Sequence, residues 1–185
     1  MSRMVVLDTE TTGLNPEKNS LIEIGAIMTD KTLADLSEFS AYVKPREFTD
    51  ISAEAMKVNQ IDLKSEEFKS SALIPEVAIK SFDGWLKAKS NGEDLFIAGW
   101  NPSFDVRFVR WYYDNMIMKW PFHYRVLDVQ SINAFYQDFE FTDLKSVRSG
   151  QKHRALDDAF DVLSRLQELA RWKDEANRYL EDNEE

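Results

Sequence analysis

The sequence predicts an α/β domain in which helices cover the faces of a mixed sheet. Three apolar segments in the first 44 residues are separated by short turns, which is the pattern of an antiparallel meander. After Pro45, short apolar strands alternate with helical patterns, as is typical of parallel strands joined by helices. A long amphipathic helix follows near the C-terminus. At 185 residues the chain is long enough to bury one core, so we expect a single domain over residues 1–180 and an acidic tail over 181–185.

The meander is expected from strands at residues 5–7, 21–29 and 37–44. The first strand is apolar and leads directly into Asp8, and the second is apolar along almost its whole length. The third alternates apolar and polar residues, which is typical of a half-buried strand. Residues 11–16 between the first two strands carry turn residues.

The second half of the chain predicts helices at residues 52–58, 75–87, 101–115 and 129–139, with strands at 95–98 and 126–127 between them. Pro75 stands where the first turn of a helix tolerates proline. Asn101 is expected to cap the third of these helices, with Pro102 in its first turn. In the last helix, apolar residues recur at spacings of three and four from Leu156 to Ala170.

The composition excludes several classes of function. The chain carries 23 basic and 33 acidic residues and a net charge of −10, whereas a non-specific binder of long duplexes normally presents a basic face. It has no cysteine, which excludes disulfides and thiolate metal sites. No apolar run approaches the roughly 20 residues that span a bilayer, and the N-terminus does not read as a secretion signal. We therefore expect a cytoplasmic protein with no membrane contact.

Acidic residues occur at three separate places where a metal ion could be held. Asp8 and Glu10 are two residues apart at the end of the first strand, so their side chains share one face of the sheet. Asp105 lies in the first turn of a helix, where the helix dipole alone favours an acid. Asp158 begins the last helix and lies nearer its apolar flank than Asp157, which we interpret as a solvated or capping residue. Each place taken alone is better explained by a structural role than by metal binding.

The three places occur together in an order that resembles the exonuclease motifs of the DEDDh family, which includes polymerase proofreading subunits, RNase T and oligoribonuclease. The motifs are the segments 7–14 (LDTETTGL), 101–105 (NPSFD) and 153–158 (HRALDD). The resemblance implies an RNase H-like fold with a mixed five-stranded sheet, an antiparallel meander plus parallel strands, over nearly the whole chain. The predicted domain is therefore an exonuclease domain.

This resemblance implies a 3′→5′ exonuclease that releases nucleoside 5′-monophosphates with two Mg²⁺ or Mn²⁺ ions. Asp8 would bridge both ions, Glu10 and Asp158 would complete the tighter site, and Asp105 would hold that ion directly or through water. His153 would be the general base that deprotonates the attacking water. The chemistry agrees, because paired cations stabilise charge at a cleaved phosphodiester and histidine has an unperturbed pKa near neutrality.

Substrate contacts are expected around the first two motifs. By resemblance, the turn after the first motif contacts the terminal nucleotide, and Leu14 is a candidate wedge against the final bases. Phe104 is either a stacking surface or a core residue. Glu23 and Asp128 are expected to make structural hydrogen bonds. The candidate substrate-binding residues are Thr9, Thr11, Thr12, Leu14, Asn101 and Phe104.

The sequence leaves the natural substrate and the partners open. Single-stranded 3′ ends of DNA or RNA and short oligonucleotides both fit an acidic nuclease. Residues 122–129 (FHYRVLDV) resemble oligoribonucleases, which degrade very short RNAs as dimers, whereas Thr11 is more typical of the proofreading and RNase T branch. A homodimer and a polymerase-type partner both stay open. A non-catalytic adaptor on the same fold is disfavoured, because all four acids and the histidine are present.

Overall fold

The five-stranded mixed sheet predicted from the sequence is confirmed in the computed structural model, which describes residues 2–137 and 154–182. The strand order is β3-β2-β1-β4-β5. β1 pairs antiparallel with β2 and β2 antiparallel with β3, whereas β1–β4 and β4–β5 are parallel. The strands are β1 (Ser2–Thr11), β2 (Leu21–Thr29), β3 (Asp35–Tyr42), β4 (Asp94–Gly99) and β5 (Phe122–Asp128).

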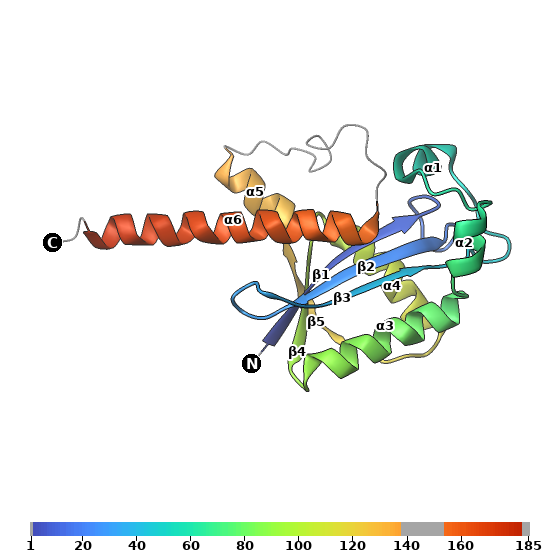
Figure 1. Ribbon diagram of the computed structural model, residues 1–185, viewed down its shortest axis with the longest axis horizontal. Helices are drawn as coiled ribbons and strands as arrows, with labels where there is room; N and C mark the ends of the chain where they lie inside the picture. Colours follow the sequence, from blue (N-terminus) through green and yellow to red (C-terminus); the bar gives the residue numbers. More distant parts are fainter. Residues whose placement is uncertain (1, 138–153, 183–185) are drawn as a thin grey trace.

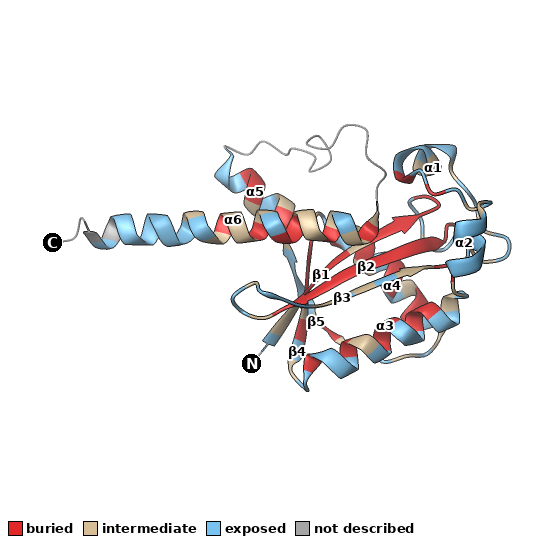
Figure 2. Cartoon of the chain, in the orientation of Figure 1, coloured by how far each residue is buried: buried red, intermediate tan, exposed pale blue. Residues whose placement is uncertain are grey.

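Helices cover both faces of the sheet, as Figure 1 shows. α6 crosses one face, and α3 and α4 lie on the other. The C-terminal half of α6 extends past the sheet and is mostly exposed (Figure 2). The helices of the described residues are α1 (Ala53–Asn59), α2 (Glu66–Ser71), α3 (Pro75–Ser90), α4 (Ser103–Asn115), α5 (Val129–Tyr136) and α6 (Ala155–Asp182).

The alternation of side chains along β1 separates two apolar cores. Val5 and Leu7 pack with α3 and α4 in one core, while Val6 packs with α6 in the other. Because successive side chains of a strand point to opposite faces, Asp8 and Glu10 continue the Val6 side. The strand therefore presents both acids toward α6.

The N-terminus of α4 differs from the prediction. The helix begins at Ser103 after Pro102, and Asn101 has a φ of 56°. Pro102 occupies the N-cap position, so the prediction that Asn101 caps this helix is wrong. The chain turns sharply from β4 into α4 at this residue, and the left-handed backbone that asparagine tolerates serves that turn. The Asn101 side chain instead accepts a hydrogen bond from the Ser103 hydroxyl at 2.9 Å.

Other boundaries shift without changing the fold. β5 is longer than the predicted 126–127. α2 was not predicted, although Ser65 caps it by accepting a hydrogen bond from the Phe68 N–H. The predicted helix from Val129 is present as α5, and its predicted end lies outside the described residues. Within the described part of the chain, no helix is long and apolar enough to cross a membrane.

Candidate metal centre and active site

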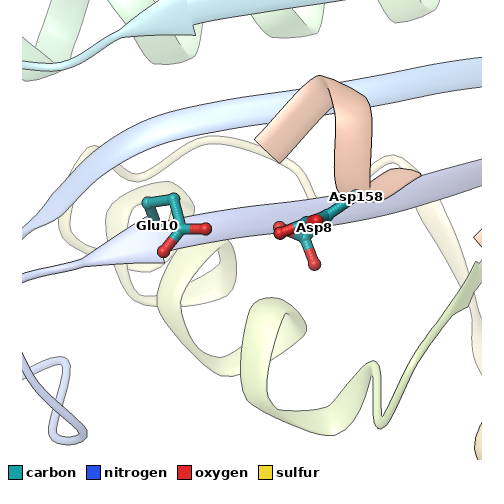
Figure 3. A group of neighbouring side chains, drawn as sticks. All are labelled: Asp8, Glu10 and Asp158. Atoms are coloured by element: carbon teal, nitrogen blue, oxygen red, sulfur yellow. The ribbon is translucent and has the colours of Figure 1, made fainter. Parts of the chain in front are cut away.

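Three of the four predicted metal ligands converge where β1 ends beneath the start of α6. Asp8, Glu10 and Asp158 each offer a carboxylate oxygen, and these atoms all lie within 4.8 Å of one another. Figure 3 shows the two strand side chains and the helix side chain directed toward a common space. Asp157, the residue that the sequence assigned to solvent, is exposed.

This donor set fits a divalent cation. Carboxylate oxygens are the ligands that hard cations such as Mg²⁺ and Mn²⁺ prefer. At the upper limit of these separations, 4.8 Å, two like charges would repel by about 1 kcal/mol in bulk water and about 3 kcal/mol at an effective dielectric constant of about 20. A bound cation would remove that repulsion, so these residues fit the expected metal site.

The close approach of α6 to the sheet depends on Gly25. This residue is the pairing partner of Asp8 across β1 and β2. A Cβ atom on it would lie 2.1 Å from the carbonyl carbon of Ala155, in the first turn of α6. Any larger residue would therefore push α6 away from the strand that carries Asp8.

A second contact between β2 and α6 is made by Glu23, whose side chain is almost fully buried. Its Oε2 accepts a hydrogen bond from the Ala155 N–H at 3.3 Å, and its Oε1 lies 3.3 Å from Nε of Arg154. Burial raises the pKa of the Glu23 carboxyl above its usual value. Arg154 and the Ala155 N–H offset only part of that rise. The structural hydrogen-bond role expected for Glu23 is confirmed.

Asp105 is positioned from the opposite face of β1. It lies in the first turn of α4, is 4% exposed, and accepts a hydrogen bond from the Thr9 hydroxyl at 2.7 Å. Thr9 stands between Asp8 and Glu10 in the strand, so one residue ties α4 to the strand segment that carries the acids. Asp105 is not one of the three residues whose oxygens lie within 4.8 Å of one another.

The threonines after the first motif build the turn that follows β1. The Thr11 hydroxyl donates to the Gly13 carbonyl at 2.7 Å, and the Thr12 hydroxyl donates to the Asp50 carbonyl at 2.8 Å. Both residues are buried, whereas Leu14 at the tip of the turn is 76% exposed. The turn therefore holds Leu14 out toward solvent, where a substrate could reach it.

Of the remaining predicted residues, Phe104 packs against a core and Asp128 caps a helix, whereas His153 cannot be placed. The ring of Phe104 packs against Phe108 at 5.1 Å between centroids, at the edge of the α3/α4 core. The Asp128 carboxylate caps α5 by accepting from the Gln130 N–H at 3.1 Å, as expected. His153 lies outside the described residues.

Sequence reasoning missed two residues that shape this region. The Asn59 side chain is buried at the end of α1; it donates to the Thr11 carbonyl at 3.1 Å and accepts from the Ile61 N–H at 3.0 Å. Gly25 interrupts an apolar strand. An isolated strand glycine is a signal for close approach by another backbone, whereas nothing in the local pattern around Asn59 identifies its partner.

Comparison with known proteins agrees with this geometry. The model of the RNase T exonuclease family matches residues 5–164. An oligoribonuclease of Baumannia cicadellinicola is 24% identical over 90% of this chain and 91% of its own length. The 3′-5′ DNA exonuclease Cap18 of Escherichia coli is 32% identical over 69% of this chain and 66% of its own length. The zinc-bound complex of Escherichia coli ExoI with ssDNA shares the fold with a TM-score of 0.74 at 16% identity, over 90% of this chain and 40% of ExoI.

The chain therefore belongs to the exonuclease family. The predicted resemblance to the DEDDh 3′→5′ exonucleases is confirmed, and so are the predicted fold and the class of enzyme, a phosphodiester hydrolase.

Proposed function

We propose that this chain is a 3′→5′ exonuclease that hydrolyses single-stranded DNA or RNA ends to nucleoside 5′-monophosphates, with two divalent ions, Mg²⁺ or Mn²⁺. The observation that carries the proposal is the convergence of Asp8, Glu10 and Asp158 to within 4.8 Å in a chain of the exonuclease family. Such a cluster of carboxylates suits phosphate chemistry, because the cations that it attracts serve that chemistry.

Each acid has a proposed role in binding and orientation. Asp8, Glu10 and Asp158 hold the cations, and Asp105, fixed by the Thr9 hydroxyl, contributes directly or through water. When bound, the cations supply positive charge to the phosphate and acidify the attacking water. His153 accepts the proton of that water, and His153→Ala is expected to lower kcat by about 10²–10⁴ with substrate binding largely kept.

The proposed substrate is an unpaired 3′ end. The net charge of −10 disfavours a long duplex, whose binding depends on many basic contacts. Leu14 is exposed in the turn that follows β1, and this exposure supports its proposed contact with the terminal base. The other candidate substrate-binding residues stay predictions: Thr9, Thr11, Thr12, Asn101 and Phe104. Their observed hydrogen bonds and packing stabilise the local structure.

A second candidate is the degradation of very short RNAs. It is favoured by the match to an oligoribonuclease over 91% of that protein's length, whereas the match to a DNA exonuclease at 32% identity favours a DNA substrate. A non-catalytic adaptor is disfavoured by the convergence of the carboxylates. A cytoplasmic location, a homodimer and a polymerase-type partner stay predictions.

A digestion panel tests the proposal. Single-stranded DNA, single-stranded RNA, duplexes and dinucleotides, labelled at either the 3′ or the 5′ end, are incubated with Mg²⁺, Mn²⁺ or EDTA. We expect immediate release of 3′ label as 5′-mononucleotide, a gradual shortening of the 5′-labelled strand, and no reaction in EDTA. A strong preference for dinucleotides would select the second candidate, and activity that persists in EDTA would refute both.

A further inference from the structure

The first turn of α6 is held on the sheet by one buried carboxylate from β2. Glu23 is 1% exposed and receives the Ala155 N–H on one oxygen and the Arg154 guanidinium on the other, each at 3.3 Å. The same guanidinium lies over the Tyr42 ring of β3, 4.5 Å from its centroid. Residues 132 positions apart in the sequence are thereby joined at the point where α6 begins.

These contacts lead directly to the metal ligand on α6. The Asp158 N–H donates to the Arg154 carbonyl at 2.9 Å, so Arg154 contacts Glu23 with its side chain and Asp158 with its backbone. A helical turn is stiff, and a shift of its first residues therefore moves Asp158 relative to Asp8. Gly25, two residues from Glu23 on the same strand, lets Ala155 approach closely. Glu23 supplies the attraction that holds it there.

Direct metal binding does not explain this carboxylate. Among the described residues, the acids whose oxygens lie within 4.8 Å of one another are Asp8, Glu10 and Asp158, without Glu23. Both oxygens of Glu23 are already engaged by donors from the start of α6. Burying an acid costs free energy unless the acid is paired. Glu23 is paired with Arg154 and Ala155, at the start of the helix that carries Asp158.

We propose that Glu23 is a positioning residue: through Arg154 and Ala155 it fixes Asp158 against Asp8 and Glu10, and so sets the affinity of the cluster for divalent cations. This inference rests on the proposed function, because it requires the cluster to bind a cation. Partners that orient metal ligands from outside the coordination sphere commonly contribute about 10–100-fold in metal affinity. We expect an effect of that size.

The test is a calorimetric titration of the folded protein with Mn²⁺. Glu23→Leu removes both contacts and is expected to weaken Mn²⁺ binding by about 10–100-fold. Glu23→Gln keeps an acceptor for the Ala155 N–H and is expected to fall between that variant and the wild type. In the nuclease assay, Glu23→Leu should raise the Mg²⁺ concentration needed for half-maximal rate, with a smaller change in kcat at saturating Mg²⁺.

Asp83→Leu is the matched control. Asp83 is also a buried acid, at 6% exposed, and it accepts a hydrogen bond from the Tyr113 hydroxyl at 3.3 Å within the α3/α4 core. Its replacement should lower the melting temperature and leave the Mn²⁺ affinity unchanged. A purely structural role for Glu23 would make the two leucine variants behave alike.

The inference is overturned if Glu23→Leu folds and binds Mn²⁺ as tightly as the wild type. It is also overturned if Asp83→Leu loses as much Mn²⁺ affinity as Glu23→Leu. If Glu23→Leu does not fold, Glu23→Gln and Arg154→Met decide the question, and unchanged affinity in both overturns it. A wild-type protein that binds no Mn²⁺ refutes the proposed function and this inference together. If the wild type binds Mn²⁺ and the Glu23 variants bind it equally tightly, only this inference is refuted.

Discussion

Replacing Gly25 with alanine should disable the active site without touching any proposed ligand. The added Cβ would lie 2.1 Å from the Ala155 carbonyl carbon, whereas ordinary contact begins at 3.4 Å. The difference, 3.4 − 2.1 = 1.3 Å, is the separation along that line that would restore ordinary contact between the two backbones. α6 carries Asp158 three residues further on, so that ligand moves away from Asp8.

The expected loss follows from that displacement. A misplacement of about 1 Å can cost about 10²-fold in rate, and overpacking a core typically costs about 1–3 kcal/mol. We therefore expect Gly25→Ala to lower kcat by about 10²-fold and to weaken Mn²⁺ binding, at a modest cost in the free energy of unfolding. Release of mononucleotides from a 3′-labelled strand and urea unfolding measure the two effects.

Gly84→Ala is the control for this experiment. Gly84 is in α3, and a Cβ there meets no atom within 4 Å. Alanine in a helix is favoured over glycine by about 1 kcal/mol, so this variant should be as active as the wild type and slightly more stable. If the Gly25→Ala protein folds and keeps the wild-type kcat and Mn²⁺ affinity, the close approach of α6 to Gly25 does not position Asp158.

Three further predictions concern other residues of the site and the core. Asp158→Asn should weaken Mn²⁺ binding by at least the roughly 10–100-fold that residues outside the coordination sphere contribute. Asp157→Asn, one residue away, should bind Mn²⁺ as the wild type does. Equal losses in the two variants would contradict the assignment of Asp158. Thr9→Val should reduce the free energy of unfolding by about 1–3 kcal/mol, because it leaves the buried Asp105 carboxylate short of a donor, and Thr9→Ser should restore it; a Thr9→Val protein as stable as the wild type would count against this bond. Burial raises the pKa of Tyr113, so its contribution to stability is complete below the ordinary tyrosine pKa of about 10 and is lost as the pH rises further, by up to about 1.4 kcal/mol per pH unit. Urea unfolding across alkaline pH should show this decline in the wild type and a weaker one in Tyr113→Phe.

The sequence by itself determined the elements and the faces of their side chains. The period of two in β1 places Asp8 and Glu10 on one face, and the apolar spacing of the last helix distinguishes Asp158 from Asp157. Both assignments depend on neighbours within one element, for which periodicity is sufficient information. The prediction failed at Asn101, where the turn from β4 into α4 required a left-handed backbone in place of a cap.

Only the tertiary structure decided how these elements meet. The bond from Thr9 to Asp105 joins residues 96 positions apart, and the bond from Ala155 to Glu23 joins residues 132 apart. No local pattern encodes such pairs, because they form only when the cores on both faces of the sheet have packed and brought α4 and α6 against β1 and β2. The three acids of the candidate metal site, Asp8, Glu10 and Asp158, could therefore be predicted from the chain. Their spacing, and the contacts of Gly25 and Glu23 with the start of α6, follow from packing.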